Sequence, residues 1–124
     1  MNKTILIIED EQQIISVLSR VMKKAGFEVI AAKDGKEGLG KALKNNPDLI
    51  LLDIVLPVMD GITFLEKYHK TVGEDKVPVI VLSNLDSADK IEESIKKGAS
   101  DYLVKTNWTL KDIVDKVNTI LKES

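Results

Sequence analysis

Four short apolar runs recur along the chain, and polar or charged side chains follow each of them directly. The runs cover residues 5–8, 49–52, 79–82 and 102–104. An unbroken apolar run of this length is typical of a strand that is buried on both faces, as in a parallel sheet. A more mixed run at 27–31 indicates a fifth strand at the edge of the sheet.

Between these strands, apolar residues recur with helical spacing. The five helical stretches begin near Glu11, at Asp34, near Ile62, at Asp86 or Ser87, and at Thr109. The side chains of Asp34, of Asp86 or Ser87, and of Thr109 are expected to cap their helices. Five strand–helix repeats predict an α/β fold, a (βα)5 flavodoxin-like doubly wound parallel sheet of five strands in the order 2-1-3-4-5. One domain over residues 1–124 is expected from the length.

Two helices carry more specific expectations. In the fourth helix we expect Ala88, Ile91 and Ile95 to face inward. In the second helix, Gly38 and Gly40 each cost up to ~1 kcal/mol relative to Ala, so this helix is expected to be the softest.

Polar side chains with the chemistry of a phosphate site stand at the ends of the apolar runs. These residues are Glu9, Asp10, Asp53, Ser83 and Lys105. Because chemistry in an open parallel sheet collects at the carboxyl ends of the strands, the five side chains should meet at one edge. Three carboxylates, a hydroxyl and an ammonium together indicate a site for a divalent metal and a phosphoryl group.

The three carboxylates predict the metal. Glu9 and Asp10 should neighbour Asp53, and one pair of carboxylates ~4 Å apart costs about 4 kcal/mol at an effective dielectric near 20. A divalent cation would neutralise the cluster, and oxygen-only ligands favour Mg²⁺ or Mn²⁺ over Zn²⁺. The alternative is that Glu9 and Asp10 merely cap the first helix and complement its dipole.

Asp53 has the best position for a nucleophile. A carboxylate can attack a phosphoryl group and form an acyl phosphate. Lys105 can pair with phosphoryl oxygens, and Ser83 can donate a hydrogen bond to one. Taken singly, such a lysine is more often a solvated surface charge and such a serine a turn residue, so the prediction depends on their joint placement.

The composition of the chain indicates which binding partners and which cellular location to expect. The 124 residues are 44% hydrophobic and 31% charged, with a formal net charge of −2, which gives no reason to expect direct nucleic-acid or membrane binding. There is no cysteine, no signal-peptide layout and no apolar run near the length of a membrane span, so a cytoplasmic location is expected. The single histidine, His69, is interpreted as a surface residue away from the site.

The whole chain resembles the response-regulator receiver domains, of which CheY is a member. The matching segments are ILIIEDE at 5–11, PDLILLD at 47–53, LPVMDG at 56–61, VPVIVLS at 77–83 and GASDYLVK at 98–105. No single segment is decisive, but together, in this order and at this spacing, they are highly specific.

The resemblance implies a role for each residue of the site. Asp53 would accept a phosphoryl group from the phosphohistidine of a partner kinase. Mg²⁺, for which Mn²⁺ could substitute, would be bound by Asp10, Asp53 and the backbone carbonyl of Val55, with Glu9 acting through water.

The remaining roles concern the phosphoryl group and the switch. Ser83 and Lys105 would contact the phosphoryl group, together with the backbone N–H groups of Val55 and Asn84. Tyr102 resembles the switch aromatic, which turns inward when Ser83 moves toward the phosphate.

The chain departs from the family pattern at three places. Thr106 follows Lys105 where the family usually has a cis proline, so this peptide bond is open to either isomer and the position of Lys105 depends on it. Asn84 stands where the family prefers Ala or Gly, and Val55 and Leu85 occupy two positions that often carry polar side chains.

We therefore expect a stand-alone receiver domain, a monomer or weak homodimer that is not an enzyme beyond its own phosphorylation and slow dephosphorylation. Its partners would be a sensor histidine kinase or phosphotransfer protein and a downstream protein target. That target would bind the face formed by the fourth helix, fifth strand and fifth helix. The alternatives are a degenerate receiver that binds a partner without phosphorylation, and an aspartyl-phosphate hydrolase. Hydrolases of this kind usually carry Asp-x-Asp, whereas Val55 fills the second position here.

Overall fold

The computed structural model describes residues 2–122, so both ends of the expected 1–124 domain lie outside the described residues. Its five strands are β1 (Thr4–Ile8), β2 (Glu28–Ala32), β3 (Leu49–Leu52), β4 (Val79–Ser83) and β5 (Asp101–Val104). All four strand pairings are parallel, and the order is β2-β1-β3-β4-β5. The predicted flavodoxin-like sheet is confirmed, with the mixed strand β2 at an edge.

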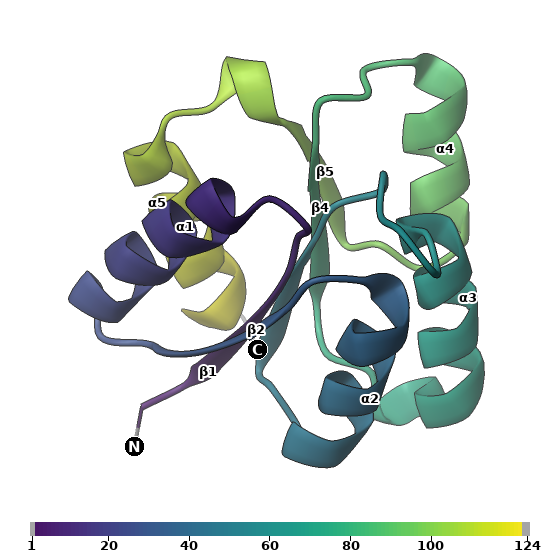
Figure 1. Cartoon of the computed structure of the whole chain (residues 1–124), viewed down its shortest axis with the longest axis horizontal. Helices are drawn as coiled ribbons and strands as arrows, with labels where there is room; N and C mark the ends of the chain where they lie inside the picture. Colours follow the sequence, from purple (N-terminus) through teal and green to yellow (C-terminus); the bar gives the residue numbers. More distant parts are fainter. Residues whose placement is uncertain (1, 123–124) are drawn as a thin grey trace.

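Helices cover both faces of the sheet (Figure 1). The α-helices are α1 (Gln12–Lys24), α2 (Gly35–Asn45), α3 (Gly61–Val72), α4 (Ala88–Lys96) and α5 (Leu110–Lys122), with short 3₁₀ turns η1 (Gly73–Asp75) and η2 (Lys105–Asn107). Helices α1 and α5 lie on one face, and α2, α3 and α4 lie on the other. Each face encloses its own hydrophobic cluster, because alternate strand residues point to opposite sides. Within residues 2–122, no helix has the length and apolar character that crossing a membrane requires.

Three helices, α2, α4 and α5, begin at residues that were predicted to cap them. The Asp34 side chain accepts a hydrogen bond from the Glu37 N–H at 2.7 Å. Of the two candidates for α4, Ser87 is the cap, accepting from the Lys90 N–H at 3.2 Å. Thr109 accepts from the Asp112 N–H at 3.1 Å, and the Asp112 carboxylate accepts from the Thr109 N–H at 3.2 Å, which completes a capping box.

The predicted inward face of α4 is wrong in part. Ala88 is exposed and Ile95 is 45% exposed, while Ile91 is half-buried. The buried residue of α4 is Ser94, whose hydroxyl donates to the Lys90 carbonyl at 2.8 Å and so needs no external partner. Tertiary packing sets the rotation of the helix, and a small side chain lets α4 approach the sheet closely.

The interpretation of His69 as a surface residue is also wrong. The side chain is half-buried, with Nδ1 2.9 Å from the Leu65 carbonyl oxygen. Gly98, at φ 111°, lies against the ring so closely that a Cβ there would stand 2.6 Å from Nδ1. Among the described residues, Nε2 is buried and has no hydrogen-bond partner. His69 is therefore part of the packing between α3 and the C-terminal end of α4.

Candidate functional site

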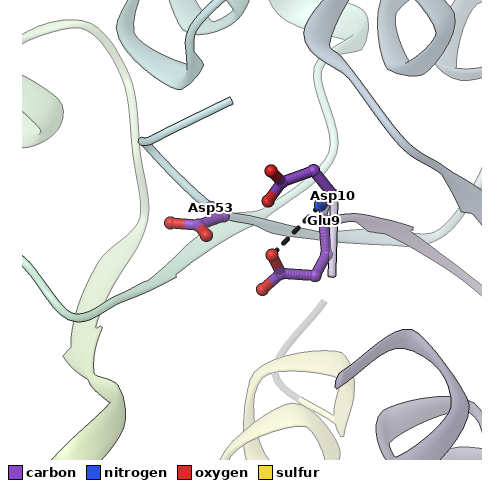
Figure 2. Close-up of side chains that lie close together, drawn as sticks. All are labelled: Glu9, Asp10 and Asp53. Atoms are coloured by element: carbon purple, nitrogen blue, oxygen red, sulfur yellow. Dashed lines mark hydrogen bonds between the residues drawn. The ribbon is translucent and has the colours of Figure 1, made fainter. Parts of the chain in front are cut away.

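Strand pairing alone brings the acidic residues together. In the β1–β3 register, Ile8 lies beside Leu52, so the residues that follow each strand are neighbours. The Asp53 N–H donates to the Ile8 carbonyl at 3.0 Å, which extends the ladder by one step. Figure 2 shows the consequence, with the side chains of Glu9, Asp10 and Asp53 gathered at the ends of these two strands.

The three carboxylates form a compact oxygen cluster. Each offers one oxygen, and these oxygens lie within 4.8 Å of one another. Glu9 and Asp53 are buried, whereas Asp10 is exposed and leaves the cluster open on one side. A set of carboxylate oxygens without nitrogen or sulfur suits a hard divalent cation such as Mg²⁺ or Mn²⁺, so these donors fit the metal that the sequence resemblance implies.

Lys105 bridges two members of the cluster. Its Nζ lies 2.6 Å from Glu9 Oε1 and 3.2 Å from Asp53 Oδ2. Burial raises the pKa of Glu9 from 4.5 to about 7; the hydrogen bond from Lys105 opposes this rise, and the charge of Asp53 adds to it. Burial lowers the pKa of Lys105, but its hydrogen bond to Glu9 and the charge of Asp53 outweigh burial and leave it raised.

Glu9 also contacts the start of α1. Its Oε2 accepts the backbone N–H of Asp10 at 3.1 Å, drawn as a dashed line in Figure 2, and that of Glu11 at 3.4 Å. Both donors precede the helix, which begins at Gln12 and has no side-chain cap hydrogen bond, so the alternative that Glu9 caps α1 is wrong. The other oxygen of Glu9 faces Lys105.

Ser83 and Tyr102 both form a hydrogen bond with the backbone of Leu85. Ser83, fully buried at the end of β4, accepts the Leu85 N–H on Oγ at 3.3 Å. The Tyr102 hydroxyl donates to the Leu85 carbonyl at 2.6 Å, and burial is the main cause that raises its pKa. The role of Leu85 was missed from sequence, because a backbone carbonyl leaves no signal in a side-chain pattern.

Three positions that depart from the family pattern follow the ends of β3, β4 and β5. Val55 is 60% exposed, and its N–H approaches Asp53 Oδ1 at a long 3.4 Å. Asn84 is exposed directly after Ser83. The described residues contain no cis peptide bond, so Lys105–Thr106 is trans, and Lys105 still reaches the carboxylates.

Comparison with known proteins identifies the family. The family model for the response regulator receiver domain matches residues 5–118, and the chain belongs to this family. It is similar to the receiver domain protein (CheY-like) of Methanospirillum hungatei, with a TM-score of 0.92, 31% identity, and coverage of 99% of this chain and 96% of the other. The observed strand order is the one shared by flavodoxin and CheY.

Two curated relatives are transcriptional regulators. PrrA of Mycobacterium tuberculosis is 37% identical over 118 residues, which cover 95% of this chain and 49% of PrrA. PhoP of Bacillus subtilis, the alkaline phosphatase synthesis transcriptional regulatory protein, is 35% identical over 126 residues, covering 100% of this chain and 50% of PhoP. The chain spans about half the length of these relatives, and its stand-alone organisation stays a prediction.

Proposed function

We propose that this chain is a phosphorylation-controlled switch of a cytoplasmic two-component system, with Asp53 as the phosphoacceptor. A carboxylate oxygen of Asp53 would attack the phosphorus of a partner's phosphohistidine. The new P–O bond forms as the P–N bond breaks, and the imidazole leaves with the bonding electron pair. The convergence of Glu9, Asp10, Asp53 and Lys105 in a receiver-family chain is the observation that carries this proposal.

The other residues of the site hold charge and position. Asp10, Asp53 and the Val55 carbonyl would bind Mg²⁺ or Mn²⁺, with Glu9 acting through water; the cation neutralises the charge that builds up on the phosphoryl oxygens. Lys105 is already 3.2 Å from Asp53 and would pair with a phosphoryl oxygen. Ser83 and the backbone N–H groups of Val55 and Asn84 would complete the contacts.

Phosphorylation would be transmitted through Ser83 and Tyr102. Movement of Ser83 toward the phosphoryl group would change its contact with the Leu85 backbone, to which Tyr102 is hydrogen-bonded. The consequence is a population shift of the face formed by α4, β5 and α5. That face would bind a downstream protein, whereas the kinase or phosphotransfer protein meets the acceptor site. We propose a monomer or weak homodimer, with no direct contact to nucleic acid or membrane.

Intact mass after incubation with acetyl phosphate tests the acceptor. The wild-type chain should gain one phosphoryl mass in a Mg²⁺-dependent manner, and Asp53→Asn should gain none. Asp48→Asn is the matched control, because Asp48 lies before β3 and accepts the Thr4 N–H far from the cluster. Labelling of Asp53→Asn at the wild-type rate would contradict the assignment.

The same assay separates the two rival functions. A wild-type chain that never reacts with acetyl phosphate and Mg²⁺ would indicate a degenerate receiver. Repeated turnover of a phosphomonoester would indicate a hydrolase, against which the exposed valine at position 55 argues, since it supplies no acid at the position where those enzymes carry one.

A further inference from the structure

The first turn of α2 presents two buried glycines to the segments that carry the site. Gly35 and Gly38 are three residues apart and therefore share one face of the helix. A Cβ on Gly38 would lie 2.6 Å from Cδ1 of Ile8, the residue directly before Glu9. A Cβ on Gly35 would overlap the Met59 carbonyl oxygen and lie 2.8 Å from its carbonyl carbon.

Met59 belongs to a strained turn in the loop that follows Asp53. Val58 has φ 66°, and the Met59 N–H donates to the Pro57 carbonyl across it at 2.7 Å. A positive φ is a real outlier for a β-branched residue, and it persists only where the surroundings over-determine it. The Val58 side chain is 77% exposed, so its own packing does not supply that restraint.

The restraint comes from two contacts of the loop over residues 54–60. Gly61 joins the two ends of the loop by donating its N–H to the Ile54 carbonyl at 2.9 Å, and a Cβ on Gly61 would lie 2.5 Å from the Asp53 carbonyl oxygen. Within the loop, Met59 lies against the Gly35 backbone. Both contacts are between backbone atoms and exist only because each position lacks a side chain.

We propose that Gly35 is a positioning residue for the metal and phosphoryl site. By abutting Met59, the start of α2 holds the loop in its strained turn and fixes the Val55 carbonyl and N–H beside Asp53. Gly38 supports the same arrangement from the β1 side by letting α2 rest on Ile8. The inference rests on the proposed function, because it assigns an effect on the Mg²⁺ site to residues that never touch the ion.

Three glycine-to-alanine variants of α2 form a graded test. Gly40 is the matched control, because a Cβ there would meet nothing within 4 Å. Gly40→Ala should bind Mg²⁺ within about twofold of wild type. Gly38→Ala should be intermediate, because the end of the Ile8 side chain can move aside. Gly35→Ala should weaken Mg²⁺ binding by about tenfold or more, the range seen when a partner beyond the ligands is altered.

Calorimetric titration with MgCl₂ gives the affinities, and amide exchange of Val55 gives a second readout independent of phosphorylation. Exchange at Val55 should accelerate in Gly35→Ala and not in Gly40→Ala. A folded Gly35→Ala chain that matches Gly40→Ala in both measurements overturns the inference. A wild-type chain that neither binds Mg²⁺ nor becomes phosphorylated contradicts the proposed function and the inference together, so the two failures are distinguishable.

A second pair of variants covers the case in which Gly35→Ala does not fold. Val58→Gly removes the strain, because glycine accepts a positive φ. This variant should keep the wild-type Mg²⁺ affinity, since the contacts of Gly61 with Ile54 and of Gly35 with Met59 remain. The double variant Gly35→Ala/Val58→Gly should fold, because its turn can yield, and should bind Mg²⁺ about tenfold more weakly than Val58→Gly. A double variant that is unfolded, or that binds as tightly as Val58→Gly, overturns the proposal.

Discussion

Glu9 shows how one side chain can combine unfavourable burial with useful contacts. Glu9 is 2% exposed as a residue and lies next to Asp53, and both facts favour the neutral form of its carboxyl group. Lys105 and two backbone N–H groups compensate in part. Because the compensation is incomplete, the pKa of Glu9 stays near 7 in the metal-free fold.

The raised pKa of Glu9 predicts a pH dependence of stability in the metal-free chain. Between pH 4.5 and about 7 the folded state holds a proton on Glu9 that the unfolded state has released. The contribution of Glu9 is therefore fully present below pH 4.5 and is lost as the pH rises through 7. Urea unfolding in chelator at several pH values should show this loss in wild type and a smaller one in Glu9→Gln. Equal slopes in the two chains would show that another group is responsible.

Tyr102 and Ser83 should be coupled, because both contact the Leu85 backbone. We expect Ser83→Ala to remain a phosphoacceptor but to weaken the change around Tyr102 on phosphorylation. Amide chemical shifts with and without acetyl phosphate measure that change. Thr71→Val is the control, because its hydroxyl bonds only within α3, to the Lys67 carbonyl. Identical shifts in wild type and Ser83→Ala would contradict the coupling.

Among the elements, α4 is the helix least anchored by apolar burial. Ser94 is its only fully buried residue, whereas α5 buries Ile113, Val117 and Leu121. The C-terminal end of α4 is held by the Gly98–His69 contact and by the ion pair of Lys97 with Glu66 at 3.4 Å. An element held mainly at one end is suited to a change of position on phosphorylation.

Two isoleucines should report this difference between the helices. Ile95→Lys in α4 should change the free energy of unfolding by no more than about 0.5 kcal/mol, because the side chain is largely exposed. Ile113→Ala in α5 should cost about 2–5 kcal/mol, because it empties a buried site. Urea unfolding measures both. A cost above 2 kcal/mol for Ile95→Lys would mean that α4 packs through its predicted face after all.

At the scale of the molecule, the acidic cluster works against the metal-free fold. Three carboxylates are held within 4.8 Å by strand pairing that the hydrophobic core enforces. A ligand that binds only the folded state stabilises it by mass action. The repulsion among the three carboxylates and the predicted affinity for a cation are therefore two aspects of one arrangement.

Mg²⁺ should accordingly raise the thermal stability of the whole chain. At a free concentration ten times its Kd, the expected gain is about 1.4 kcal/mol. Asp10→Ala should abolish most of this gain while leaving the metal-free chain at least as stable, because Asp10 is exposed and adds to the repulsion. Thermal unfolding with MgCl₂ or chelator measures both effects. An unchanged Mg²⁺ response in Asp10→Ala would exclude direct ligation.

The sheet, its edge strands and the charged residues that gather at the site could all be predicted from the amino-acid pattern. Short unbroken apolar runs favour strands that are covered on both faces, and the carboxyl ends of parallel strands share one edge. The proximity of Glu9, Asp10, Asp53 and Lys105 could therefore be predicted from the sequence, as could the helix caps Asp34 and Thr109. These features depend on local pattern and on topology that pattern fixes.

Features that depend on how the elements pack against one another could not be predicted from the sequence. The rotation of α4, the burial of His69 and the Leu85 link between Ser83 and Tyr102 arise from contacts between segments distant in sequence. From the sequence, Gly38 and Gly40 are expected to destabilise α2 equally relative to alanine. Only the fold separates them, because Gly38 rests on Ile8 whereas Gly40 faces open space.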